Sequence, residues 1–403
     1  MIDAVHDIGR RPIGADAWVI EEDGRARRGL WAGAGWRRRS NDARNRERRE
    51  KEGKSVHAGA MLPRVVADGA ANEYALCAMD YTRLGSTGLK VSRLALGCGN
   101  FGGVGSAPAF FGKGENEAQA AALMDRAFDA GITLFDTANA YGGGRSEAYI
   151  GRWLQAKGSA AREQLVVSSK VFNPVGPGPN DRGLSRRHIL QQVDESLTRL
   201  QTDRLDLYLI HEPDPETPLD ETLAALDDLL RMGKVLYVGA SNIEAWRLAR
   251  GLWISDVRKL TRFEWVQNSY SLLDRTPERE LFPLCEDTGV GFTSFSPLAG
   301  GWLTGKYRSP GTYPEGSRMT LRPEPYLHLE SDRVFRGLTT FADEAAARGS
   351  DMTALAIAWV LHHPRVDAAI VGPRTPAHLD AALAALSVTL DDLDAERLGK
   401  LFQ

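Results

Sequence analysis

The chain has few cysteines: Cys77, Cys98 and Cys285 are the three among its 403 residues. An odd number of widely spaced cysteines argues against a disulfide framework and against a zinc site built from clustered thiolates. The adjacent pair His362 and His363 falls on a predicted helix, where neighbouring side chains point apart, so no metal site is expected. The scarcity of cysteine is typical of the reducing cytoplasm, which we predict as the location.

Long apolar runs are also missing. No segment approaches the roughly 20 apolar residues that a helix needs to cross a bilayer, and the first residues lack the pattern of a secretory signal. The formal net charge is only −3, so the chain as a whole gives no reason to expect nucleic acid or a membrane surface as a partner. With 43% hydrophobic and 26% charged residues, its composition is ordinary for a globular enzyme.

Residues 1–78 have no sustained hydrophobic period. Within them, residues 25–54 hold ten Arg and two Lys against four carboxylates, a local excess of eight positive charges. Such a segment buries too little apolar surface to offset its chain entropy. We predict a disordered or spurious extension, with translation beginning at Met79 or Met61. The alternative is a basic arm for nucleic acid or membrane, but neither interleaved aromatics nor an amphipathic face supports it. The functional domain is predicted as residues 79–403.

From Met79 onward, short β-branched runs alternate with amphipathic stretches. The predicted strands are residues 91–98, 132–138, 164–171, 205–211, 235–241, 264–268, 291–295 and 368–371. The predicted helices are residues 116–131, 146–158, 185–200, 219–233, 243–252, 278–288, 331–349, 351–362 and 375–386. Eight strands separated by helices predict an α/β protein with a parallel (β/α)8, or TIM, barrel. A doubly wound open sheet is the alternative, but Gly97-Cys98-Gly99-Asn100 after the first strand does not match its GxGxxG fingerprint.

Two segments outside this alternation also carry predictions. Residues 86–91, with Gly85 and Gly88, predict a small N-terminal β-hairpin that caps the bottom of the barrel. Residues 299–329 are rich in glycine and proline and have no helical period, and a loop of this length is usually functional. Substrate choice is assigned to this loop and to residues 100–115 and 172–184. Aromatic side chains there give the hypothesis of an aromatic-lined pocket, namely Phe101, Phe110, Phe111 and Trp302.

Four ionisable residues lie at, or just beyond, the carboxyl ends of three adjacent predicted strands. They are Asp136, Tyr141, Lys170 and His211. Because catalytic groups of barrels lie at the carboxyl ends of the strands, these side chains are expected on one rim. The set suits carbonyl reduction: Tyr141 donates a proton, Lys170 lowers the pKa of the phenol, Asp136 anchors Lys170, and His211 orients the carbonyl.

From Met79 to the end, the chain resembles the aldo-keto reductase superfamily, and within it the bacterial oxidoreductase branch that also contains potassium-channel beta subunits. The opening residues 81–92 look like the usual start of these proteins. The most specific segments are Phe135-Asp136-Thr137-Ala138, Tyr141-Gly142, Gly144-Arg145-Ser146-Glu147, Lys170 and Leu207-Tyr208-Leu209-Ile210-His211 with Pro213-Asp214. The resemblance implies that Asp136, Tyr141, Lys170 and His211 are the catalytic tetrad, the same assignment that the chemistry gives.

The resemblance also implies a set of cofactor contacts. Ser241, Asn242 and Gln267 are expected at the nicotinamide carboxamide, and Phe295 is expected to stack on the ring. Residues expected around the pyrophosphate are Ser296, Leu298, Gly300 and Lys306. Gly372 and Arg374 resemble the site of the 2′-phosphate, and a guanidinium suits a phosphate monoester, so NADPH rather than NADH is the expected cofactor.

The last part of the cofactor site departs from the family pattern. The family has a glutamine four residues after this arginine and a Glu-Asn pair beyond it, where this chain has His378, Ala381 and Ala382. Arg374 therefore has less support at the adenosine end. The expected activity is NADPH-dependent reduction of a small aldehyde or ketone. The alternatives are a redox-sensing regulatory subunit that binds NADPH, and a barrel aldolase that uses Lys170 as a Schiff-base nucleophile.

Overall fold

Eight short parallel strands close into a barrel in the computed structural model, which describes residues 79–403. The predicted extension, residues 1–78, lies outside the described residues. The order around the barrel follows the sequence, and the last strand pairs with the first to close it. The strands are β3 (Leu94–Gly97), β4 (Leu134–Asp136), β5 (Val166–Val171), β6 (Leu205–Ile210), β7 (Val235–Ser241), β8 (Trp265–Ser269), β9 (Gly291–Phe295) and β10 (Ala368–Val371). The predicted (β/α)8 barrel is confirmed.

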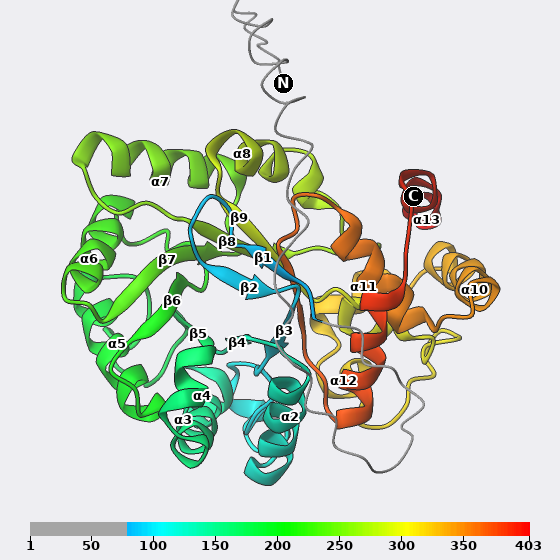
Figure 1. Cartoon of the computed structure of the whole chain (residues 1–403), viewed down its shortest axis with the longest axis horizontal. Coiled ribbons are helices and arrows are strands. Elements are labelled where there is room, and N and C mark those ends of the chain that lie inside the picture. Colours follow the sequence, from blue (N-terminus) through cyan, green and yellow to red (C-terminus); the bar gives the residue numbers. More distant parts are fainter. Residues whose placement is uncertain (1–78) are drawn as a thin grey trace, which may run out of the picture. The chain divides into compact units, whose positions relative to one another are not determined.

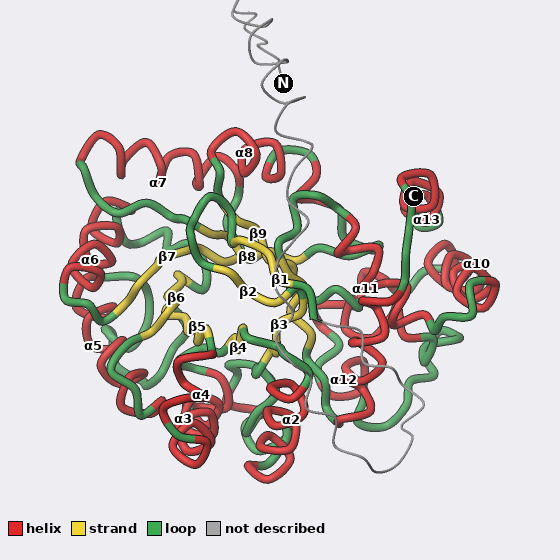
Figure 2. The backbone as a smooth tube through the Cα atoms, viewed as in Figure 1, coloured by secondary structure: helices red, strands yellow, loops and turns green. Residues whose placement is uncertain are grey.

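Helices surround the barrel (Figure 2). They are α2 (Glu117–Asp129), α3 (Arg145–Lys157), α4 (Ser159–Gln164), α5 (Arg186–Leu200), α6 (Leu219–Arg231), α7 (Ala245–Arg258), α8 (Leu281–Thr288), α10 (Asp332–Ala347), α11 (Met352–His362), α12 (Pro376–Leu383) and α13 (Asp392–Lys400). Several begin with a side-chain cap that accepts from a first-turn amide, as Asn116 does for α2 and Thr375 for α12. No helix among residues 79–403 is both long and apolar enough to cross a membrane.

Alternation along the strands separates the two sides of the barrel wall. In β5, Val166 belongs to the cluster inside the barrel, whereas Val167 and Val171 pack in the outer cluster against helices. The same parity places Leu134 of β4 and Leu209 of β6 inside. Because side chains of a strand alternate with a period of two, the inward parity continues to the residues at the carboxyl end of each strand. This continuation brings the candidate site residues into the barrel mouth.

A hairpin closes the opposite end of the barrel (Figure 1). Strand β1 (Tyr81–Arg83) pairs antiparallel with β2 (Lys90–Ser92), and Leu84 and Val91 pack with the residues inside the barrel. The turn lies against the start of β9: Gly85 has a φ of +55°, and a Cβ there would come within 2.3 Å of the backbone nitrogen of Gly291. A side chain is therefore excluded at Gly85. The predicted hairpin cap is confirmed.

Several predicted boundaries were wrong. The first predicted strand, residues 91–98, is two strands, because β2 belongs to the hairpin and Arg93 turns away to donate to the Val366 carbonyl at 2.7 Å. The helix predicted for residues 146–158 is α3, within one residue at each end, but the short α4 after it was not predicted. Helix α7 continues to Arg258, and α13 was not predicted. The long segment 299–329 forms short helices: η4 (Ala299–Thr304), α9 (Arg318–Leu321) and η5 (Glu324–Leu329).

Candidate active site

The buried ion pair of Lys170 and Asp136 lies at the base of the barrel mouth. The Lys170 ammonium donates to Asp136 Oδ2 at 2.6 Å and to the Thr137 carbonyl at 2.9 Å. The other carboxylate oxygen, Oδ1, accepts from Ser168 at 2.8 Å and from Gln267 at 3.0 Å. Both Lys170 and Asp136 are buried, so the pair depends on these additional hydrogen bonds to offset the cost of removing two charges from water.

These contacts keep Lys170 charged. Burial lowers the pKa of Lys170, but the Asp136 carboxylate and the Tyr141 phenol outweigh it, and the pKa rises above its ordinary value. The ammonium is fully buried and already bonded to a carboxylate and a carbonyl. A Schiff-base nucleophile needs a neutral, accessible amine. The geometry therefore disfavours the aldolase alternative.

Tyr141 stands between Lys170 and His211. The Lys170 ammonium lies 5.2 Å from the centroid of the Tyr141 ring, and the phenol oxygen lies 3.3 Å from His211 Nε2. Burial raises the pKa of Tyr141, and the charge of Lys170 and its hydrogen bond only partly oppose this. The expectation that Lys170 lowers the pKa of the phenol is right about the direction of that one contribution. It is wrong about the net shift, because burial of the phenolate costs more.

The imidazole of His211 is held from both sides. Its Nδ1 lies 3.0 Å from the Asn173 side-chain nitrogen, and its ring meets that of Tyr141 edge to face at a centroid distance of 5.4 Å. Burial, with the positive charge of Lys170, lowers the pKa of His211 well below its ordinary value. The ring is therefore neutral at physiological pH, with one nitrogen that donates and one that accepts.

A cavity of about 900 Å³ opens above these residues. All of the sequence-predicted site residues line it except Lys170, which lies buried behind Asp136 and Tyr141. The lining residues predicted as catalytic or cofactor-binding are Asp136, Tyr141, His211, Ser241, Asn242, Gln267, Phe295, Ser296, Leu298, Gly300, Lys306, Gly372, Arg374 and His378. The structure thus gathers predicted residues from six strand ends and the long segment 299–329 around one space.

Some of these side chains already have partners within the protein. Asn242, whose φ is +52°, donates to the His211 carbonyl at 3.0 Å. The Ser296 hydroxyl lies 3.1 Å from that of Tyr326. Arg374 donates to Glu115 at 2.7 Å and to the Gly316 carbonyl at 2.8 Å, so it joins three separate loops of the barrel mouth.

One wall of the cavity is positively charged. Burial lowers the pKa of Lys306, and the charges of Arg318 and Arg374 lower it further, which places these three cations close together. Among residues 79–403, no carboxylate lies within ion-pair distance of Lys306 or Arg318, and Glu115 pairs with Arg374 alone. Cations that repel one another favour a ligand with several negative charges. The donor set therefore fits the phosphates of a dinucleotide.

The aromatic-lined pocket expected from the sequence was wrong in its members. Phe101 and Trp302 are completely buried in the outer core, and neither Phe110 nor Phe111 lines the cavity. Tyr326 and Phe295 are aromatic lining residues instead. Trp302 faces Tyr307 and Phe335, so it stabilises the fold of the loop.

The polar lining residues that the sequence argument missed include Asn173, Arg318 and Arg322. These three lie in segments that were identified as loops over the site. No periodicity marks individual positions in such segments, so nothing in the sequence separated Arg318 from Arg308, whose guanidinium donates to a nearby carbonyl outside the cavity.

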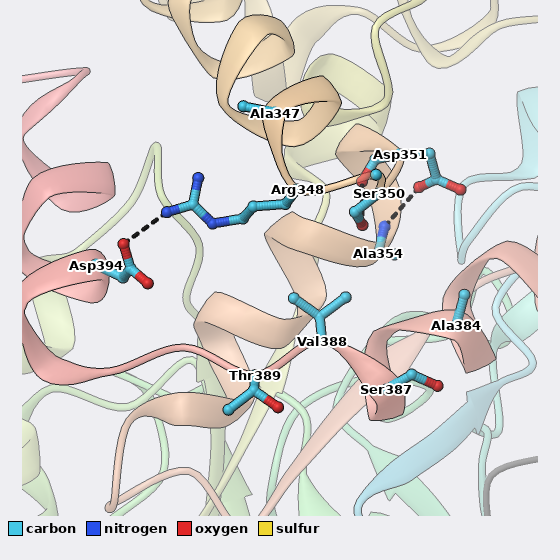
Figure 3. A pocket seen from close by; sticks show the side chains of 11 residues that line it. Ala347, Arg348, Ser350, Asp351, Ala354, Ala384, Ser387, Val388, Thr389 and Asp394 are labelled. Carbon is cyan, nitrogen blue, oxygen red and sulfur yellow. Dashed lines mark hydrogen bonds and ion pairs between the residues drawn. The ribbon is translucent and has the colours of Figure 1, made fainter.

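A second cavity of about 900 Å³ lies among α10, α11, η6 (Ala384–Ser387) and the start of α13. Figure 3 shows Arg348 reaching across it to Asp394, at 2.6 Å. Arg348 also pairs with Glu344, and the Asp351 carboxylate caps α11 by accepting from the Ala354 amide. These charged groups are therefore already paired within the protein.

Comparison with known proteins agrees with the fold. The family model described as "Aldo/keto reductase family" matches residues 93–402. A closed (β/α)8 barrel with these rim residues and this match defines the class: the chain belongs to the aldo/keto reductase family. Members of this family generally use a nicotinamide dinucleotide.

Individual relatives cover nearly the whole domain. The chain is 39% identical over 332 residues to the uncharacterized oxidoreductase YrpG of Bacillus subtilis (strain 168), a match over 80% of this chain and 96% of the relative. It is 35% identical over 333 residues to versiconal hemiacetal acetate reductase of Aspergillus parasiticus, over 77% and 94%. It is also 35% identical over 318 residues to a probable voltage-gated potassium channel subunit beta of Arabidopsis thaliana, over 77% and 92%. Family and relatives together support an oxidoreductase role.

Proposed function

We propose that the protein reduces the carbonyl group of a small aldehyde or ketone to an alcohol, with NADPH as the cofactor and Tyr141 as the proton donor. The observation that carries this proposal is the position of the Tyr141 hydroxyl, held between the charged Lys170 and the neutral His211 at the base of the cavity. Bound NADPH supplies the hydride for the carbonyl carbon.

Residues of the chain then orient the carbonyl oxygen of the substrate and donate a proton to it. Asn173 donates to Nδ1 of His211, so the ring proton lies on Nε2, where it can donate to the carbonyl oxygen and orient it. Tyr141 transfers its proton to the same oxygen as negative charge develops there. The nearby Lys170 charge stabilises the phenolate that remains, and Asp136 keeps Lys170 in position.

The residues that would hold NADPH follow from the donor set of the cavity. Ser241, Asn242 and Gln267 offer amides and a hydroxyl for the nicotinamide carboxamide, and Phe295 offers a ring face. The backbone around Ser296, Leu298 and Gly300, with Lys306 and Arg318, suits the pyrophosphate. Arg374 and His378 line the same cavity, and the Arg374 guanidinium suits the 2′-phosphate of NADPH.

The test uses the purified full-length chain with NADPH or NADH and a panel of aldehydes, and follows loss of the reduced nicotinamide by absorbance. Turnover that is abolished by Tyr141→Phe, while NADPH binding measured by fluorescence is kept, supports the reductase. Tight NADPH binding without turnover of any carbonyl would contradict it. That outcome would favour a redox-sensing regulatory subunit, a role for which the potassium-channel relative is the supporting observation.

A further inference from the structure

Arg322 has no assigned role in the proposed reaction, although it lines the same cavity. It directly follows α9, and its guanidinium lies over Gly105: a Cβ at that glycine would come within 2.6 Å of Arg322 Nη1. Gly105 also has a φ of +73°, so a side chain there is both strained and blocked. On its other side, the guanidinium faces the Phe110 ring at 5.8 Å from the centroid. These contacts place the Arg322 head group against the loop between β3 and α2.

That loop leads directly to the catalytic tyrosine. Gly105 donates its amide to the Gly99 carbonyl at 2.8 Å and accepts from the Gly142 amide at 3.0 Å. Gly99 faces the Tyr141 ring, with 3.6 Å between a Cβ built on the glycine and Tyr141 Cε2. Arg322 therefore lies on the side of the cavity next to Tyr141.

The charge of Arg322 adjoins that of Arg318, one member of the cationic wall assigned to the cofactor. The pKa of Lys306 responds to burial, Arg318 and Arg374, and that of His378 responds to burial, Lys306 and Arg374, with no contribution from Arg322 in either case. Arg322 influences its neighbour on α9, Arg318. Arg322 is thus adjacent to Arg318, and the proposed cofactor contacts do not include it.

No counter-ion within residues 79–403 neutralises Arg322. No carboxylate lies within ion-pair distance of it, and the carboxylate of Asp136 in the cavity is committed to Lys170. Glu212, the other carboxylate that lines the cavity, is exposed and follows His211. A partly buried guanidinium without a carboxylate partner, restrained by an aromatic ring, suits a planar anion, which it can bind with two parallel hydrogen bonds.

We propose that Arg322 binds a carboxylate of the carbonyl substrate, so that the preferred substrates are aldehydes or ketones that also carry a carboxylate. The inference rests on the proposed reductase function. The carbonyl oxygen must be hydrogen-bonded to Tyr141 and His211 for the carboxylate of the same substrate to reach Arg322. It specifies the chemical class of the substrate, which the tetrad alone does not.

The test compares acids with their neutral esters. The pairs are 4-carboxybenzaldehyde with methyl 4-formylbenzoate, and succinic semialdehyde with its methyl ester, so that a rigid and a flexible spacer are both sampled. For at least one pair, Arg322→Met is expected to lower kcat/KM for the acid at least about tenfold more than for the ester, which is the loss of one charge-assisted contact. The matched control is Arg333→Met, an exposed arginine of α10 outside the cavity, which leaves both rates at the wild-type level.

Other outcomes would overturn the inference. Equal losses on acid and ester, no loss on either, or a tenfold weaker affinity of Arg322→Met for NADPH would each assign Arg322 a different role. If the wild type turns over no aldehyde, the reductase proposal fails. Calorimetric titration of the four compounds in the presence of NADP⁺ then tests the carboxylate site separately. Weaker binding of an acid to Arg322→Met, with the ester less affected, would keep the carboxylate site; identical binding to both proteins would remove it.

Discussion

The side-chain nitrogen of Asn173 lies 3.0 Å from Nδ1 of His211, and Nε2 of the same ring lies 3.3 Å from the Tyr141 hydroxyl. An amide nitrogen can only donate, so Nδ1 must accept, and the single proton of the neutral ring lies on Nε2. Asn173, which lies outside the predicted tetrad, therefore determines which nitrogen of His211 carries the proton, and that nitrogen faces the Tyr141 hydroxyl.

Asn173→Asp should reverse this tautomer, because a carboxylate accepts from Nδ1 and also raises the pKa of the imidazole. We expect kcat for aldehyde reduction to fall about 100-fold, the usual loss for one misdirected hydrogen-bond donor at a reacting oxygen. Steady-state kinetics over a range of pH measure this fall in kcat. Asn173→Ala serves as the comparison: it removes the donor without adding a charge, so it should lose less activity and show no new ionisation. Identical losses and pH profiles for the two variants would mean that Asn173 only supports the loop.

Asp136→Asn should destabilise the fold as well as the site. It leaves the Lys170 charge buried without its carboxylate partner, which typically costs about 3–5 kcal/mol in the free energy of unfolding. Urea denaturation of the full chain measures the change. The double variant Asp136→Asn/Lys170→Met removes the unpaired charge and should recover most of the loss. If the double variant is no more stable than the single one, the pair does not act as described.

Arg374→Leu should weaken NADPH binding more than NADH binding. The proposed contact with the 2′-phosphate is a charge-assisted one, so we expect Kd for NADPH to rise at least about tenfold while Kd for NADH changes little. Titration of each cofactor by fluorescence measures both values. Arg365→Leu, outside the cavity, is the control. Equal weakening for both cofactors would instead assign Arg374 to the loops that it joins through Glu115 and Gly316.

The pH dependence of reduction follows from two pKa shifts of known sign. Burial lowers the pKa of His211 well below its ordinary value, and burial raises the pKa of Tyr141 despite Lys170. Reduction needs neutral His211 and protonated Tyr141, so kcat/KM should stay level from about pH 6.5 to about pH 9, since ordinary pKa values for these groups are about 6.5 and 10. An acid limb near pH 6.5 that disappears in His211→Gln would contradict the buried, neutral imidazole.

The same shift of His211 affects stability in a defined direction. In the unfolded chain the imidazole takes up a proton below about pH 6.5, whereas the folded chain does not until a lower pH. The unfolded state therefore binds more protons in that window, and the contribution of His211 to stability declines as the pH falls through it. Urea midpoints of wild type and His211→Gln between pH 5 and pH 7 should converge as the pH is lowered, if the glutamine variant is the less stable one at pH 7.

The barrel and the position of the rim residues could be predicted from the sequence because both follow from the order of short apolar runs and helical stretches along the chain. Short runs rich in apolar residues mark β5 and β6, and Lys170 and His211 stand at the carboxyl ends of these runs. Loop residues follow no such rule. Asn173 and Arg322 reach the cavity through the path of the backbone around Gly105 and Phe172, and the sequence did not indicate that path. The direction of the net pKa shift of Tyr141 was missed for a related reason, because the burial of this side chain depends on all the segments that form the barrel mouth.

Pairing of β10 with β3 leaves the barrel without a strand edge. An open sheet exposes unpaired amides and carbonyls at its margins, where a changed loop can invite pairing with another chain. Here the loops at the mouth join strands whose backbone groups are already paired around the ring, and the hairpin covers the opposite end. Insertions or substitutions in residues 100–115, 172–184 or 299–329 can therefore alter which molecules enter the cavity without exposing an unpaired strand edge. In evolutionary terms, the closed wall separates the acquisition of new substrates from the risk of aggregation.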